Sequence, residues 1–390
     1  MPESKGDSIN PGRKKLDFRR YLRREPVVLA LLSVLAVVFF LAVTGLSHMF
    51  HAQQEFLGNR WFMRGNTDLQ QGHFDRAVTE FRASLLYSRD NYSYQLNLAQ
   101  ALLGLKRTGE ADSYLINLWE REPENGLVNL ALARIAAQKG ETEKALRYYH
   151  NAVYATWPGD QEVQRRDTRL ELIEYLLNIN AKAQAQAELI ALAANLEDDP
   201  VQQAQVADFF LQAGDYEHAL AEYRLTLKAQ PHEPSALAGA GFAAYQLGHY
   251  SLAERYLQGA VAADPNDAQS AARLRTAALV MKMDPFQRQI SVAQRDRIVL
   301  EAFTTASERL KSCSPAGDLN TTLPGLAGDW AKMKPRVTEL GLRRDPDLVN
   351  SAMDLVFNIE RQTEHQVSRC GAPTATDTAL LLIAKLHETS

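Results

Sequence analysis

An uninterrupted apolar run near the N-terminus dominates the polarity pattern of the chain. Residues 26–46 read PVVLALLSVLAVVFFLAVTGL and include no charged side chain. At about 1.5 Å of rise per residue, such a run forms roughly 31 Å of helix, which matches the ~30 Å hydrocarbon layer of a bilayer. The pattern therefore predicts a transmembrane helix over residues 26–46, in contact with lipid.

The residues before this run are strongly basic. Residues 13–24 read RKKLDFRRYLRR and hold seven Lys and Arg, and such residues beside a span stay preferentially in the cytoplasm. This predicts a basic cytoplasmic segment over residues 1–25 and a body outside the cytoplasm. A cleaved signal peptide is the rival interpretation, but the run is long and no A-x-A-like site follows it. We therefore expect an uncleaved single-pass anchor, in the inner membrane of a bacterium.

After the apolar run, apolar positions recur at helical spacing within a longer period of about 34 residues. A glycine tends to lie five residues before the alanines that mark the period, and an aromatic residue or leucine lies four residues after them, as in GHFDRAVTEF and GDYEHALAEY. The alanines are Ala77, Ala111, Ala145, Ala219 and Ala253. A small residue lies 12 positions before each, at Gly65, Ala99, Ala133, Ala207 and Gly241. Prolines 12 positions after, which should end the second helix, are Pro123, Pro231 and Pro265.

This pattern resembles the tetratricopeptide repeat, a pair of antiparallel helices of about 34 residues. Five clear copies cover residues 58–158 and 200–265, and residues 170–199 resemble a degenerate copy with Ala187 at the alanine position. The resemblance implies an all-α fold, with a solenoid and its capping helix over residues 52–283. Small residues would let paired helices approach closely, and aromatic residues would fill the space between repeats.

The resemblance also implies a concave groove lined by the first helix of each repeat, at its fifth, ninth and twelfth positions. The fifth positions are Phe62, Leu96, Leu130, Ala204 and Ala238. The ninth positions are Asn66, Gln100, Arg134, Asp208 and Phe242. The twelfth positions are Leu69, Leu103, Ala137, Leu211 and Tyr245. An apolar floor with a polar column suits a peptide whose amides need polar partners; ordinary solvated helix faces are the alternative interpretation.

The partner-binding residues that the resemblance implies are Asn66, Asn97, Gln100, Arg134, Phe242 and Tyr245. Some members of the family hold a terminal carboxylate with a clamp of Lys and Asn residues. Asn66 and Asn97 match the two Asn positions, but Phe62, Leu127 and Ala131 stand at the cationic positions. We therefore expect protein or peptide partners, of an identity that the sequence does not reveal, and no carboxylate clamp.

The C-terminal part of the chain matches no family pattern. Residues 286–390 have helical spacing over 290–311, 347–369 and 376–387, with prolines between, which predicts a separate helical domain. The chain has two cysteines, Cys313 and Cys370. Their even number and the oxidising location predict a disulfide, and two buried free thiols are the alternative.

Composition and charge narrow the function classes further. The formal net charge is −4, and from residue 26 onward 35 Lys and Arg stand against 43 Asp and Glu. Nucleic-acid binding needs clustered positive charge, so no nucleic-acid partner is expected. The sequence has no P-loop, nucleophile elbow or Cys/His metal pattern. We therefore expect neither a cofactor nor a metal site nor an enzyme.

Together these features predict a membrane-anchored scaffold that binds protein partners on the extracytoplasmic face, in envelope or secretion assembly. Two other classes stay open. The repeats could face the cytosol, as in an organelle-type receptor, which would break the Lys/Arg rule. The C-terminal segment could be an enzyme for which the repeats are a spacer.

Overall fold

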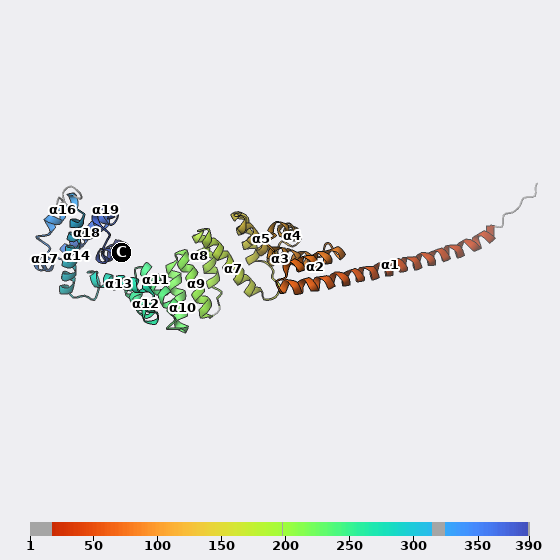
Figure 1. Ribbon diagram of the computed structural model, residues 1–390, viewed down its shortest axis with the longest axis horizontal. Coiled ribbons are helices and arrows are strands. Elements are labelled where there is room, and N and C mark those ends of the chain that lie inside the picture. The colour runs from red at the N-terminus through yellow and green to blue at the C-terminus, as the bar shows by residue number, and fades with distance from the viewer. Residues whose placement is uncertain (1–17, 197, 314–323, 389–390) are drawn as a thin grey trace, which may run out of the picture. The chain divides into compact units, whose positions relative to one another are not determined.

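The computed structural model describes residues 18–196, 198–313 and 324–388. Within them there are nineteen helices and no β-strand, so the predicted all-α class is confirmed. The chain divides into two units, Met1–Arg165 and Arg166–Ser390, each with its own dense packing. Figure 1 colours the helices of the first unit red to yellow and those of the second yellow-green to blue.

The longest helix, α1 (Phe18–Gln70), joins the apolar run to the first repeat without a break. The sequence pattern separates a span from a repeat region that begins at residue 52, whereas the structure has 53 continuous helical residues. In the described residues α1 is the one helix long and apolar enough to cross a membrane, and none of its most apolar stretch is buried. Helix-forming residues fill the junction, 47–57, and neither Gly nor Pro interrupts it.

The helices that follow α1 alternate as antiparallel pairs. Those of the first unit are α2 (Phe74–Tyr87), α3 (Tyr92–Gly104), α4 (Thr108–Arg121), α5 (Gly126–Gln138) and α6 (Thr142–Val153). Helix α7 (Gln161–Asn178) carries the boundary between the units. The second unit continues with α8 (Lys182–Ala193), α9 (Pro200–Ala213), α10 (Tyr216–Ala229), α11 (Pro234–Gln246), α12 (Tyr250–Ala263) and α13 (Ala268–Met283). Helices α4, α10 and α12 each end two residues before the predicted proline.

The predicted small residues lie where paired helices meet. The five marker alanines are completely buried, and the small residues 12 positions before them are buried as well. A Cβ atom on Gly65 would lie 2.6 Å from the Phe81 ring, which is too close for any side chain. The recurrent small residues are thus a packing requirement of each pair, as predicted.

The degenerate repeat has a different register from the predicted one. Helices α7 and α8 form its pair, but Ala187 is exposed and Ala185 is completely buried. Ala185 precedes Ala219 by one full repeat period, so the period is intact from α8 onward. The insertion before it is therefore six residues long, whereas Ala187 at the alanine position would require eight. The prediction of Ala187 at the alanine position is therefore wrong.

A residue with positive φ lies five positions before the buried alanine and ends the first helix of each pair. Glycine fills this position in four of the six repeats, with φ between 72° and 81°. Lys106 and Asn180 fill it in the other two, both at φ 59°. They are the only described residues other than glycine with positive φ. A left-handed backbone costs roughly 1–2 kcal/mol for a residue with a Cβ atom, and asparagine tolerates it better than lysine.

Replacing Lys106 by glycine should therefore stabilise the first unit by about 1 kcal/mol, because glycine adopts positive φ without strain. Thermal unfolding followed by circular dichroism would show a higher midpoint. The matched control is Gly140→Ala, since no atom lies within 4 Å of the added Cβ and only the backbone at φ 72° is strained. That variant should lose about 1 kcal/mol. A lower midpoint for Lys106→Gly would contradict the argument.

The C-terminal helices share the core of the second unit. They are α14 (Val292–Ser312), α16 (Pro324–Met333), α17 (Glu339–Arg344), α18 (Asp347–Glu364), α19 (Val367–Cys370) and α20 (Ala375–Glu388). Helix α20 packs against α13, α14 and α18, and one apolar cluster runs from Ile173 through Val280 to Ala384. The cluster is continuous across the proposed boundary between 283 and 286, so a separate domain over 286–390 stays a prediction.

Candidate partner-binding grooves

The ninth positions of the first unit form a row of polar side chains that the fold leaves accessible. Asn66 and Gln100 are half-buried and Arg134 is exposed. The residues just before them, Gly65, Ala99 and Ala133, are buried. Adjacent residues of each helix thus point in different directions, one into the core and the next out of it. Among the described residues, no hydrogen bond holds the side-chain amides of Asn66 or Gln100.

The fifth positions supply an apolar floor beside this row. Phe62, Leu96 and Leu130 are all half-buried. The Phe62 ring lies 4.9 Å from that of Tyr94, between centroids, and 5.8 Å from that of Phe81, so it is fixed from two sides. A floor that is already ordered costs a ligand little conformational entropy.

Asn97 differs from the other predicted residues of this unit. Its side chain is half-buried, and its Nδ2 donates to the Ser93 carbonyl oxygen of its own helix at 3.0 Å. A partner would have to compete with this bond. The four residues predicted in the first unit therefore differ in availability, and their role in binding remains a prediction.

The second unit has an aromatic counterpart of the same groove positions. Phe242 and Tyr245 are half-buried on α11. The Tyr216 ring meets Phe242 edge to face at 6.0 Å, and the Tyr250 ring meets Tyr245 in the same way at 5.4 Å. The Arg273 guanidinium lies 4.4 Å from the Phe242 centroid, a cation–π distance. This unit therefore offers aromatic faces beside a cation, where the first offers the two amides and Arg134.

Hydrogen bonds and burial set the protonation of the tyrosines near this groove. The Tyr223 hydroxyl donates to Oδ1 of Asp208, the ninth-position residue of α9. Burial raises the pKa of Tyr223, and the nearby carboxylate raises it further. Burial also raises the pKa of Tyr245, against the opposing charge of Arg273. Both hydroxyls are therefore neutral donors at physiological pH.

Sequence reasoning missed Arg273, although the period contains the signal for it. Helix α13 begins one repeat period after α11, and its buried Ser270 and Ala277 correspond in the same way to the buried Ala236 and Ala243. Carrying the period one step further would have identified α13 as another first helix. Its exposed side would then have been examined for groove residues.

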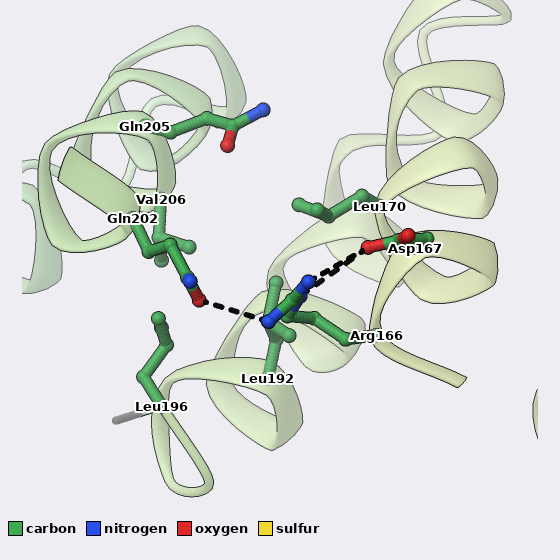
Figure 2. Close-up of a pocket in the computed structure, with 8 residues that line it drawn as sticks. All are labelled: Arg166, Asp167, Leu170, Leu192, Leu196, Gln202, Gln205 and Val206. Carbon is green, nitrogen blue, oxygen red and sulfur yellow. Dashed lines mark hydrogen bonds and ion pairs between the residues drawn. The ribbon is translucent and has the colours of Figure 1, made fainter. Parts of the chain in front are cut away.

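A small pocket lies between α7, α8 and α9 of the second unit. Its volume is about 110 Å³. Figure 2 shows Arg166 between its two partners, with nitrogen atoms 3.4 Å from Gln202 Oε1 and 3.2 Å from Asp167 Oδ1. Ligand pockets usually exceed about 300 Å³, and here the charges already satisfy one another. The pocket therefore offers no cofactor site, and among the described residues no cluster of three or more His, Cys, Asp or Glu offers a metal site.

A buried charged cluster lies in the C-terminal helices beside the two cysteines. Cys313 and Cys370 are joined by a disulfide in the structure. Arg309 is 5% exposed and donates to the carbonyl oxygens of Thr363, Cys370 and Gly371 at 3.0–3.1 Å. Its charge thus holds the chain that follows α19 in place. The signal in the sequence was an arginine in the helical core stripe of α14, with Ala302, Ala306 and Cys313.

Glu360 is the buried acid of this cluster. It is 1% exposed, and its Oε1 has no hydrogen-bond partner among the described atoms. Burial raises the pKa of Glu360 to about 8, the Asp377 carboxylate adds to the rise, and the Arg309 charge opposes it. This acid is therefore largely protonated at neutral pH. The cluster faces the core rather than a cleft, so it acts on stability.

Comparison with known proteins identifies the repeats. Family models described as tetratricopeptide repeat match residues 62–115 and 210–278. Cellulose synthase operon protein C of Komagataeibacter xylinus is 27% identical over 214 residues, which are 50% of this chain and 16% of that protein. The inactive TPR repeat-containing thioredoxin TTL3 of Arabidopsis thaliana is 30% identical over 104 residues, 27% of this chain and 15% of that protein. The chain thus spans about a sixth of the length of these relatives.

Two solved structures share the helical repeat at low identity. YrrB, a TPR protein with an unusual peptide-binding site, is 15% identical, with a TM-score of 0.40 over 49% of this chain and 95% of its own. PilF of Pseudomonas aeruginosa is 16% identical, with a TM-score of 0.39 over 56% of this chain and 97% of its own. Both TM-scores are below 0.5, so the identity of the repeats rests on the family models and on the repeat period of the sequence.

Proposed function

We propose that this tetratricopeptide-repeat protein is an anchored interaction scaffold whose grooves bind peptide segments of partner proteins. Helix α1 would hold it in the inner membrane of a bacterium, with the repeats on the extracytoplasmic face. The partners would belong to envelope or secretion assembly.

One observation carries the binding part of this proposal. In each repeat of the first unit, the residue just before the ninth position is buried, and the ninth-position side chain is accessible. The accessible amides of Asn66 and Gln100 have no hydrogen bond among the described residues. Asn66 lies about one helical turn after Phe62, whose ring is held by Tyr94 and Phe81. A bound peptide would satisfy these amides with its backbone and bury apolar side chains on the floor.

The anchoring part is supported by α1 and by the charges before it. Large apolar side chains between Val28 and Phe50 are 52–70% exposed, which is costly in water and favourable in lipid. Seven Lys and Arg precede the run, so the positive-inside rule favours a cytoplasmic N-terminus. The bacterial setting is drawn from the relative in Komagataeibacter xylinus.

The groove proposal predicts a loss of partners in the variant Asn66→Ala, Gln100→Ala, Arg134→Glu. In-cell crosslinking followed by mass spectrometry would compare it with the parent chain. Three lost polar contacts, at about 1 kcal/mol each, should weaken binding more than tenfold. The matched control is Gln70→Ala, Asn117→Ala, Arg147→Glu, which makes the same chemical changes at exposed positions outside the groove set. Equal partner recovery from both variants would remove the groove from the proposal.

The same cells test the predicted location. Because Cys313 and Cys370 are each 3% exposed, a reporter cysteine is better placed at Leu86, which is 80% exposed. In the variant Leu86→Cys, a membrane-impermeant maleimide should label the protein once the outer membrane is permeabilised, while the inner membrane is still intact. Labelling only after the inner membrane is broken would instead favour repeats that face the cytosol.

A further inference from the structure

Of the four exposed large apolar side chains on α1 beyond the predicted span, three follow a line, and the fourth, Phe50, lies off it. Met49, Phe56 and Met63 are 65%, 68% and 58% exposed, and they are spaced seven residues apart. Ala52 and Asn59, which lie three residues after the first two of them, are exposed as well. These five residues define a stripe along one side of the helix, and we call it the α1 stripe. Residues at this spacing face a second helix in a coiled coil.

The repeats do not cover the α1 stripe, and lipid does not reach its residues Phe56 and Met63. The opposite side of the helix faces the core, where Gly58 and Gly65 approach Tyr94 and Phe81. Phe56 lies two residues before Gly58, and Met63 lies two residues before Gly65. Two residues correspond to about 160° around the helix axis, so both side chains point away from the core. Phe56 is ten residues beyond Leu46, about 15 Å along the axis, whereas the headgroup layer extends only about 5–8 Å.

A preceding repeat does not fit beside α1 either. One and two repeats later, the positions that correspond to Arg64 are Leu98 and Leu132, and both are buried. Arg64 itself is exposed. The first repeat is therefore polar where a preceding repeat would pack, so a preceding repeat is not the occupant. The seven-residue spacing of the α1 stripe fits a single helix that lies alongside α1.

The charges that flank the α1 stripe favour a second copy of this chain. Taking Phe56 as position a of a heptad, Glu55 is at g and Arg60 is at e. In a parallel pair of helices, a g residue faces the e residue five positions later on its partner. Glu55 of each copy would therefore meet Arg60 of the other. Among the described residues, neither side chain has an ion pair within its own chain.

We propose that α1 forms a parallel two-helix coiled coil with a second copy of this chain, along the α1 stripe. The parallel direction rests on the anchoring part of the proposed function, because two copies inserted in one membrane point the same way. Each solenoid would then present its groove beside that of its partner, and a dimer could hold two peptide segments together.

Cysteine crosslinking of the full chain in membranes tests the geometry. Single cysteines replace Met49, Phe56 or Met63, and matched controls replace His51 or Arg64, which are exposed but lie off the stripe. Oxidation should produce disulfide-linked dimers from the three stripe variants and at least fivefold less from the controls. The parent chain, which keeps Cys313 and Cys370, measures the background. Equal crosslinking at all five positions, or none, would overturn the proposal.

Charge reversal tests the choice of partner. In the Met63→Cys background, Arg60→Glu places two acidic pairs at the interface and should reduce the dimer about tenfold. Adding Glu55→Arg restores both pairs and should restore the dimer. If the dimer is not restored by the second substitution, or if the crosslinks join this chain to another membrane protein, the proposed self-association is wrong. Alkaline extraction of the same membranes reports anchoring by itself: a chain that stays in the membrane without dimers refutes only the dimer, whereas a chain that is released refutes the anchor.

Discussion

Replacing Trp157 by alanine should lower the free energy of unfolding of the first unit by about 3–5 kcal/mol, the range for removing a buried tryptophan. Trp157 is 3% exposed and packs with Ala152, Leu127 and Leu130. Its Nε1 donates to the Ala152 carbonyl oxygen at 2.9 Å. The ring covers Gly126 at the start of α5, where a Cβ atom would collide with it. Chemical unfolding of the solubilised chain, followed by circular dichroism, measures the loss.

Trp61→Ala is the matched control, because the Trp61 side chain is only half-buried and its ring is covered by the Arg64 guanidinium on one side. It should lose about 1 kcal/mol, of the order of an exposed cation–π contact. Gly126→Ala is an independent route to the same result, since the added Cβ would displace the Trp157 ring. Similar losses of stability for Trp157→Ala and Trp61→Ala would show that the packing of Trp157 against the start of α5 does not stabilise the first unit.

The burial of Trp157 could not be predicted from the repeat period. The repeat register predicted the buried alanines because each is required by the same contact in every pair. Trp157 lies in the inserted residues between two repeats, where no second copy exists to reveal its role. Its burial depends on Gly126, at the start of α5, through the bridge that joins Asn125 to Thr156. A contact of this kind leaves no periodic trace in a single sequence.

The same insertion explains the error at Ala187. An insertion separates Ala145 from the next repeat, so the period of the earlier repeats does not fix the alanine position beyond it. Counting back from Ala219 gives Ala185, which is the buried residue. The turn before it also hid the repeat, since Asn180 occupies the position where four other repeats have glycine. The existence of the degenerate repeat was thus predictable from the sequence, but its register after the insertion was not.

The groove positions could be located from the repeat pattern, whereas the buried contacts of the C-terminal helices could not. The accessibility of positions such as Asn66 and Gln100 could be predicted, because the family resemblance assigns a direction to each repeat position. Their role in binding stays a prediction. The contacts of Arg309 and Glu360 could not be predicted, because their partners lie on other helices that are distant along the chain. Helical periodicity indicates that a residue is buried, but not which charge it will meet.

Burial of Glu360 should make the second unit less stable as the pH rises from about 5 to 8. Its pKa is raised to about 8 in the folded chain, against an ordinary value near 4.3 for glutamate in the unfolded chain. Below the ordinary value both states hold the proton, and the contribution of this group to stability is fully present. Between the two values the folded state holds the proton and the unfolded state releases it. Stability then falls by up to about 1.4 kcal/mol per pH unit, and the fall ends above the folded pKa.

Glu360→Gln isolates this effect, because a neutral amide of the same shape has no proton to release. Near pH 5 the variant and the parent should be similarly stable, or the parent slightly more stable, since the amide adds buried donors. Between pH 5 and pH 8 the variant should gain about 3–4 kcal/mol of stability relative to the parent. Glu308→Gln, an exposed position on α14 beside Arg309, is the control and should follow the parent at every pH. Urea unfolding at pH 5, 6, 7 and 8 measures the difference. If Glu360→Gln and the parent lose stability with the same slope, Glu360 is ionised in the folded chain, and Arg309 rather than a proton neutralises it.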